Sequence, residues 1–154
     1  MKGFISIDLP TKPYIKAYVQ HKLGTHPKMS QNRDTISSKL YDLLQHRTNE
    51  YASEGVSNLY TVKLRLYIPV SVFRQRGGNL NVTNLKNLNQ YIENEIKDKF
   101  YFAMDRDMAV FPNFVQNLPE IRRQLGIDIE AWPDDSMQKD YYRYRMRKNK
   151  LKAA

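Results

Sequence analysis

The sequence predicts an α+β fold that is mainly helical, with a small antiparallel sheet and a helix-turn-helix-like unit at the C-terminal end. Two short segments, 3–9 and 59–68, alternate apolar and polar residues, as half-buried strands do. Several longer segments repeat apolar residues at intervals of three and four, as helices packed on a core do. The last third of the chain holds two such helical patterns separated by a glycine.

The first half of the chain begins with the predicted strand at 3–9. Thr11 is a suitable cap for a helix that follows it, and Gly24 is expected to end that helix. The polar stretch from 25 to 34 indicates a loop. A second helix is expected to begin near Asp34 or Thr35. Its predicted buried positions are Ile36, Leu40, Leu43 and Leu44.

The segment 59–68 has the clearest alternation in the chain and predicts a strand that Pro69 ends. Residues 74–78, Arg-Gln-Arg-Gly-Gly, are expected to form a basic bend. A long helix capped by Thr83 should follow, and the aromatic run at 100–102 is expected to cross the core. The buried positions predicted for this helix are Leu85, Leu88, Ile92, Ile96 and Phe100.

The last third of the chain is predicted to be helical. Asn117, followed by Pro119 and Glu120, is typical of a helix start, and Gly126 of its end. A turn anchored by Trp132 should lead to a final helix from Asp134 or Asp135 to about Lys148. We therefore expect an α+β body at 1–112 and a helix-turn-helix-like unit with a basic tail at 113–154, packed as one domain.

The charge of the chain indicates a polyanionic partner. The 154 residues include 25 Lys and Arg against 16 Asp and Glu, which gives a net charge of +9. Residues 137–154 alone hold seven Lys and Arg against one Asp, whereas 128–136 hold four acids and no base. The complete lack of cysteine excludes a disulfide framework, a thiol nucleophile and a cysteine-based zinc site.

The final helix is the strongest candidate for a functional surface. Met137, Tyr141 and Tyr144 recur at helical spacing and predict a buried stripe. Cations on its other faces can bind phosphates, arginine can reach base edges, and tyrosine rings can stack on unpaired bases. We therefore predict nucleic-acid binding, with DNA favoured over RNA. The predicted contact residues are Lys139, Tyr142, Arg143, Arg145, Arg147 and Lys148, with Arg74 and Arg76 extending the path.

Other interpretations of this helix stay open at the level of sequence. The connection from 126 to 134 is longer than the three or four residues of a helix-turn-helix, so that similarity is partial. A basic helix is also compatible with an ordinary solvated surface. It could instead dock on an acidic protein, or on the 128–136 segment of a second copy, which would give a homodimer.

Several strings of residues carry a resemblance to known proteins. They are Gly-Phe-Ile-Ser-Ile at 3–7, the segment 10–18, Lys-Asp-Lys-Phe-Tyr-Phe at 97–102, Gly-Ile-Asp-Ile at 126–129, Asp-Asp-Ser at 134–136, and 139–145. Over most of its length the chain resembles a largely uncharacterised group of small basic proteins from bacterial phages and integrated mobile elements. The resemblance implies a DNA-binding accessory or regulatory protein of such an element, and it assigns no site residue.

The sequence predicts no enzyme and no metal or other cofactor. His21 and His26 are five residues apart, off the four-residue spacing that aligns metal ligands on a helix. Asp105 and Asp107 could begin a two-carboxylate metal site, but they diverge on a helix and are expected at a solvated helix end. Residues 77–78 lack the Lys-Ser or Lys-Thr that follows the glycines of a phosphate loop.

Adjacent tyrosines are also found in enzymes that nick DNA through a tyrosine nucleophile. Tyr141 and Tyr142 form such a pair, but the metal-binding His-apolar-His pair that this chemistry needs is missing. The apolar stretch near the start is broken by Ser6 and Asp8, unlike a secretion signal. No window approaches the roughly 18 apolar residues of a membrane span. We therefore expect a cytoplasmic protein without membrane association.

Overall fold

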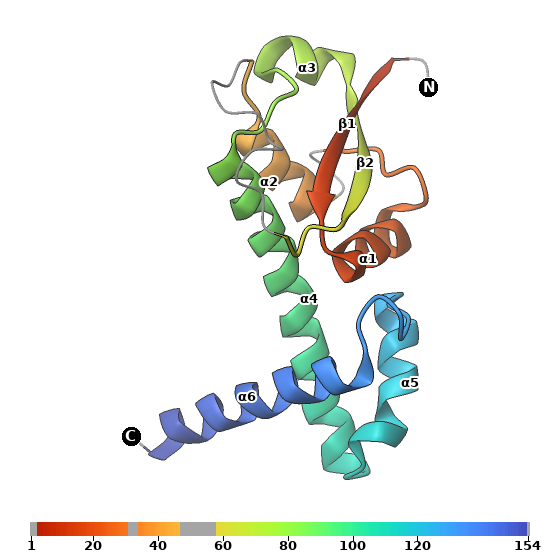
Figure 1. The fold of residues 1–154 in the computed structure, drawn as a ribbon, viewed down its shortest axis with the longest axis vertical. Helices are drawn as coiled ribbons and strands as arrows, with labels where there is room; N and C mark the ends of the chain where they lie inside the picture. The colour runs from red at the N-terminus through yellow and green to blue at the C-terminus, as the bar shows by residue number, and fades with distance from the viewer. Residues whose placement is uncertain (1–2, 31–33, 47–57, 154) are drawn as a thin grey trace. The chain divides into compact units, whose positions relative to one another are not determined.

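A computed structural model describes residues 3–30, 34–46 and 58–153 (Figure 1). These residues form two antiparallel strands and six helices, so the predicted α+β class is confirmed. The chain divides into two compact units, Met1–Asn94 and Glu95–Ala154. The boundary falls within the long helix α4 (Val82–Val110), whereas the sequence indicated a division after residue 112. The difference arises because the second half of α4 supplies core residues to the helical unit.

The sheet of the first unit consists of β1 (Phe4–Thr11) and β2 (Val62–Pro69), which are far apart in sequence and pair in antiparallel fashion. Asp8 on β1 lies opposite Arg65 on β2, and their side chains form an ion pair at 3.0 Å. Helices α1 and α2 lie between the two strands in the chain. The small sheet therefore joins the two ends of the first 69 residues.

The alternation predicted for the second strand is confirmed. Leu64, Leu66 and Ile68 are fully buried, and the residues between them are more exposed. The strand begins at Val62, so Tyr60, which was expected to lie within it, precedes it. Alternation alone does not show where a strand begins, because each strand residue also needs a hydrogen-bonded partner. The partner strand β1 ends at Thr11, which lies opposite Val62.

Helix α1 (Pro13–Leu23) ends at Gly24 as predicted, but its N-cap is Lys12 and not Thr11. Thr11 is the last residue of β1, and its hydroxyl donates a hydrogen bond to the side chain of Asn89. Helix α2 (Thr35–Leu43) begins as predicted, where the Asp34 side chain accepts a hydrogen bond from the Ser37 amide at 2.6 Å.

Of the segment 74–78, which was predicted to be a basic bend, residues 74–76 instead belong to a helix, α3 (Val70–Arg76), and the chain bends only at the two glycines that follow it. Pro69 precedes its first residue, and Gly77 ends it with a φ of 82°. The seven residues between contain neither proline nor glycine, so nothing in them opposes a helix. The two glycines therefore mark the end of a helix and not a bend that includes the arginines.

Helix α4 carries the buried stripe that the sequence predicted, and all five of its positions are at most 1% exposed. Its cap differs from the prediction. Asn81 accepts a hydrogen bond from the Asn84 amide at 2.7 Å, and Thr83 lies within the first turn. The aromatic run also differs, because Phe100 and Tyr101 are buried but Phe102 is 71% exposed.

The second unit contains the second half of α4 together with α5 (Phe114–Leu125) and α6 (Asp134–Ala153). Helix α5 starts at Asn113, whose side chain accepts from the Gln116 amide, and not at Asn117 as predicted. Phe114 is buried, which extends the apolar stripe of α5 one turn before Pro119.

Aromatic rings fill the core of the second unit. The ring centroid of Phe100 lies 5.3 Å from that of Trp132 and 6.1 Å from that of Tyr141. Trp132 is 3% exposed, so the predicted anchoring of the turn by this residue is confirmed. The connection between α5 and α6, residues 126–133, is longer than the turn of a helix-turn-helix.

None of the helices in the described ranges is both long enough and apolar enough to span a lipid bilayer.

Candidate nucleic-acid interface

Helix α6 is held to its unit by one face. Met137 is fully buried and Tyr141 is 2% exposed, so this part of the predicted stripe is confirmed. The Tyr141 ring packs 5.7 Å from Phe114 and 6.1 Å from Phe100 between centroids. Burial of two large side chains in an aromatic core fixes the rotation of α6, and therefore decides which cations face outward.

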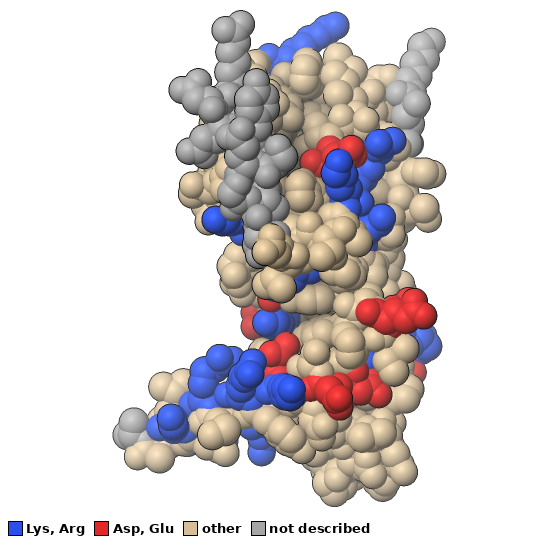
Figure 2. All heavy atoms as spheres, viewed as in Figure 1, with Lys and Arg blue, Asp and Glu red and all other residues tan. Residues whose placement is uncertain are grey.

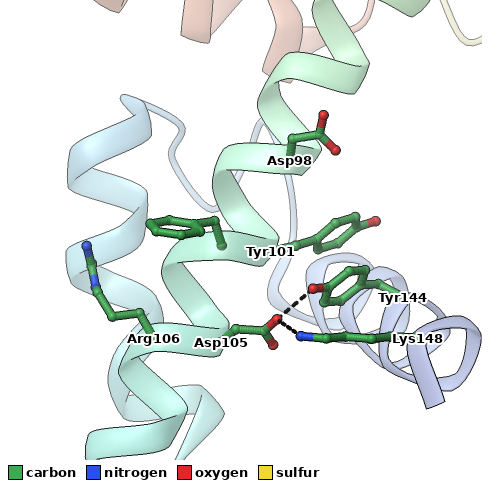
Figure 3. A pocket seen from close by; sticks show the side chains of 7 residues that line it. Asp98, Tyr101, Asp105, Arg106, Tyr144 and Lys148 are labelled. Atoms are coloured by element: carbon green, nitrogen blue, oxygen red, sulfur yellow. Dashed lines mark hydrogen bonds and ion pairs between the residues drawn. The ribbon is translucent and has the colours of Figure 1, made fainter. Parts of the chain in front are cut away.

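One carboxylate organises the next two turns of α6. Asp105 on α4 accepts hydrogen bonds from the hydroxyls of Tyr141 at 2.7 Å and Tyr144 at 2.6 Å. It also accepts from Arg145 Nη1 at 3.3 Å and from Lys148 Nζ at 3.0 Å. Figure 3 shows Tyr144 and Lys148 reaching Asp105 from α6. We call these five residues the Asp105 cluster.

The cluster lowers the pKa of its carboxyl group. Burial of Asp105, whose side chain is 19% exposed, would raise its pKa from 3.8. The hydrogen bonds from Tyr144, Tyr141, Lys148 and Arg145 outweigh burial and bring the pKa to about 2. The carboxylate is therefore ionised at neutral pH, and its negative charge is shared by two cations.

Tyr144 joins α6 to α4 through its ring as well as its hydroxyl. The Tyr101 and Tyr144 rings stack with centroids 4.3 Å apart and planes 5° from parallel. Lys148 Nζ lies 5.7 Å from the centroid of the Tyr144 ring.

Burial, together with a hydrogen bond to Asp105, raises the pKa of Tyr141. Its hydroxyl is thus a hydrogen-bond donor within the fold and is poorly placed to act as a nucleophile.

The structure divides the predicted contact residues of α6 into two groups. Arg145 and Lys148 are bound to Asp105, although their side chains are still 47% and 39% exposed. Lys139, Arg143 and Arg147 are exposed on the opposite side of the helix. Arg143 is 70% exposed and lies 3.8 Å from Asp140.

We call this second surface the outer face of α6. At 3.6 residues per turn, Lys139, Arg143 and Lys150 point away from the Met137–Tyr141 stripe, with Arg147 beside them. All four are exposed. Tyr142, 53% exposed, and Met146, 62% exposed, border these cations. On the face shown in Figure 2, Lys and Arg side chains gather along the later part of α6 and acidic ones toward its beginning.

Arg74 and Arg76 belong to α3 in the first unit. Arg74 is exposed. Arg76 donates a hydrogen bond to the carbonyl of Tyr41 at 3.1 Å and lies 4.0 Å from the Asp42 carboxylate, so part of its bonding capacity serves the fold. Their role as an extension of the α6 surface stays a prediction.

Asp105 is the important residue that the sequence reasoning missed. It was expected at a solvated helix end, and the structure shows that this was wrong, because four side chains of α6 bond to it. A signal was present in the sequence. Tyr141, Tyr144, Arg145 and Lys148 place four hydrogen-bond donors next to a buried stripe, and such donors need an acceptor from a neighbouring element.

The histidines and the other acids weighed for metal chemistry make different contacts. Among residues 3–30, 34–46 and 58–153, no group of three or more His, Asp or Glu side chains could hold a metal ion. The His26 ring packs edge-on against Tyr67, and His46 makes a hydrogen bond with the Gln75 carbonyl at 3.0 Å. Asp107 pairs with its neighbour Arg106 at 3.0 Å.

The first unit contains a buried polar network where the end of β1 meets α4. Thr11, Asn89 and Glu93 are at most 7% exposed. Asn89 donates to the carbonyl of Pro10 at 3.0 Å, and Lys12 Nζ lies 3.0 Å from both carboxylate oxygens of Glu93. These mutual bonds satisfy the polar groups and tie the end of β1 to α4, which is a structural role.

Comparisons of the chain with protein-family models, with curated proteins and with solved structures gave no match.

Proposed function

We propose that this protein binds nucleic acid, DNA in preference to RNA, and that the outer face of α6 makes the main contacts. The observation that carries the proposal is the division of α6 into two faces. One face is anchored by Met137, Tyr141 and the Asp105 cluster, and the other presents four exposed cations to solvent. A helix that is anchored on one face and carries a row of exposed cations on the other is suited to a row of phosphates.

The spacing of the cations supports this proposal. Lys139, Arg143 and Arg147 are four residues apart, so successive charges are separated by about 6 Å along the helix axis. Lys150 extends the row to a total of about 16 Å. Duplex DNA carries one negative charge per about 1.7 Å of its axis, so a row of this length meets several phosphates.

The concentration of charge on α6 is local and does not reflect a generally basic unit. Residues 95–154 contain 12 Lys and Arg against 10 Asp and Glu. The exposed acids Asp128, Glu130 and Asp135 lie at or just before the beginning of α6. They would repel phosphates there, so contact falls on the middle and end of the helix. Helix-turn-helix proteins instead present the N-terminal residues of the recognition helix to the groove.

The salt dependence of binding tests this proposal. Neutralisation of about four phosphates by the outer face predicts a slope of about −3.6 in a plot of log affinity against log salt for duplex DNA. For a single strand the corresponding slope is about −2.8. Fluorescence anisotropy of a labelled oligonucleotide, titrated at several salt concentrations, measures both slopes. An affinity that does not change with salt would contradict the proposal.

The resemblance to small basic phage proteins suggests the setting of this activity. A protein of this kind would serve a phage or an integrated mobile element as an accessory or regulatory DNA-binding factor. Its location would then be the cytoplasm.

A second candidate function is self-association or docking on an acidic protein. The exposed acids Asp128 and Glu130 flank Ile129, which is 56% exposed, and this short acidic segment could receive the basic part of α6 from a second copy. Sedimentation without nucleic acid in 0.1 M and 1 M salt separates the two functions. Salt-sensitive dimers support the second candidate, and a monomer at both salt concentrations that shifts only when DNA is added supports the first.

A further inference from the structure

Phe102 is an exposed aromatic side chain on the second half of α4. It is 71% exposed, whereas its neighbours Phe100 and Tyr101 are buried. A single exposed apolar residue is common on protein surfaces and by itself indicates nothing. The surroundings of Phe102 give it significance, because it lines a hollow of the second unit.

This hollow has a volume of about 600 Å³, within the range of ligand pockets. The stacked rings of Tyr101 and Tyr144 supply part of its wall. We call it the α4–α6 hollow. The residues that line it are Asp98, Tyr101, Phe102, Asp105, Arg106, Tyr144 and Lys148.

The polar groups of the hollow have different capacities for a ligand. Asp105 already accepts four hydrogen bonds from α6, so its carboxylate stabilises the wall of the hollow. Asp98 is exposed, and Figure 3 shows it on the same side of α4 as Tyr101 and Asp105. Its carboxylate can accept hydrogen bonds from exocyclic amino groups. Arg106 and Lys148, 52% and 39% exposed, are paired with Asp107 and Asp105, and their remaining N–H donors can meet phosphates.

We infer that the α4–α6 hollow receives an unpaired base of single-stranded nucleic acid, with the ring of Phe102 as the stacking surface. Every base has a π face that stacks on an aromatic ring, and a base inside a duplex does not expose that face. Asp98 accepts from the amino group of cytosine or adenine, which thymine lacks. The inference rests on the proposed function, because the outer face of α6 holds the phosphates of the same strand.

Arg147 connects the two surfaces. It is one of the cations of the outer face, and it lies three residues after Tyr144, whose ring stacks on Tyr101 in the wall of the hollow. A strand whose phosphates follow the outer face therefore reaches the edge of the hollow. This arrangement of a basic track beside aromatic platforms is the usual one for single-strand binding.

Anisotropy titrations with labelled oligo(dC) and with a duplex of equal length test this inference. Phe102→Ala should weaken oligo(dC) binding about 5- to 150-fold, the range found for loss of one stacked base. It should change duplex binding less than about twofold. Phe102→Trp should restore oligo(dC) binding, and its added fluorescence should be quenched by the stacked base. Asp98→Asn should weaken binding of oligo(dC) and oligo(dA) more than that of oligo(dT).

Phe111→Ala is the matched control. Phe111 is 50% exposed in the same unit and does not line the hollow, so its loss should leave both affinities unchanged. Equal oligo(dC) affinities of the Phe102→Ala and Phe111→Ala variants would overturn the inference and leave the proposed function intact, provided that the wild type binds with the expected salt slope. An equal loss of duplex and single-strand binding in Phe102→Ala would also overturn it. A wild-type protein that binds neither probe would refute the proposed function and the inference together.

Discussion

The carboxylate of Asp105 and the hydroxyl of Tyr144 lie 2.6 Å apart and join the last helix of the chain to α4. The ring of the same tyrosine stacks on Tyr101 at 4.3 Å, so one side chain makes two kinds of contact. Because two cations of α6 also bond to Asp105, this contact decides which of the basic residues stay free for a partner. The stability of α6 and the composition of its outer face are thus linked.

Asp105→Asn should destabilise the protein by about 2 kcal/mol. The amide keeps the size of the side chain but has no charge. Its NH2 group would face the four groups that donate to Asp105 in the wild type, so hydrogen bonds would be lost. Urea unfolding monitored by circular dichroism measures the change. Asp107→Asn, which removes one exposed ion pair with Arg106, is the control and should cost less than about 0.5 kcal/mol.

The stabilisation by Asp105 should depend on pH in the acid range. Its pKa is about 2 in the folded protein, against 3.8 without the fold. A lowered pKa stabilises the folded state above the unfolded value and loses that stabilisation as the pH falls from about 4 to about 2. The difference in unfolding free energy between wild type and Asp105→Asn should therefore shrink over this interval. A difference that stays constant down to pH 2 would show that Asp105 is not held as described.

The two contacts of Tyr144 can be separated by substitution. Tyr144→Phe removes the hydrogen bond to Asp105 and keeps the stack on Tyr101, so it should cost about 1–2 kcal/mol. Tyr144→Leu should cost about 0.5–1.5 kcal/mol more, because it also removes the stack. Thermal unfolding gives both values. Tyr142→Phe is the matched control on the exposed side and should change the stability by no more than about 0.5 kcal/mol.

Glycine 77 provides a test of the first unit. Gly77 has a φ of 82°, and a Cβ atom there would overlap the backbone of Gln45 and His46. Gly24 has a φ of 95° but open space around the same position. Gly24→Ala should therefore cost about 1 kcal/mol from backbone strain alone, and Gly77→Ala about 2–5 kcal/mol. Equal losses of unfolding free energy in urea would contradict the close approach of Gly77 to the backbone of residues 45–46.

The sequence predicted those parts of the fold that depend on regular apolar spacing. The alternation of β2 and the stripe of α4 were readable because each buried position follows its neighbour at a fixed interval. Helix starts were less predictable. Asn113 and Asn117 have the same capping chemistry, and only the burial of Phe114 in the tertiary structure selects the first of them.

The candidate site could be predicted only in part, for a similar reason. The amphipathic spacing of α6 revealed its buried stripe and its cations. Which cations are free depends on Asp105, which is 36 residues before Tyr141 in the chain, and local spacing cannot show such a contact. The exposure of Phe102 was not predicted either. Its neighbours Phe100 and Tyr101 are also aromatic, so burial of all three residues was the simplest expectation.

The affinity of a triple variant for duplex DNA tests the central claim most directly. Lys139→Ala, Arg143→Ala and Arg147→Ala together remove three cations of the outer face, and the salt slope should become shallower by about 2.7. The control replaces Lys22, Lys63 and Lys86, three exposed lysines of the first unit, and makes the same change in net charge. We predict that anisotropy titrations show at least about tenfold weaker binding for the first variant and less than about twofold for the second. An equal loss in both would show that net charge, and not the outer face of α6, is responsible for binding.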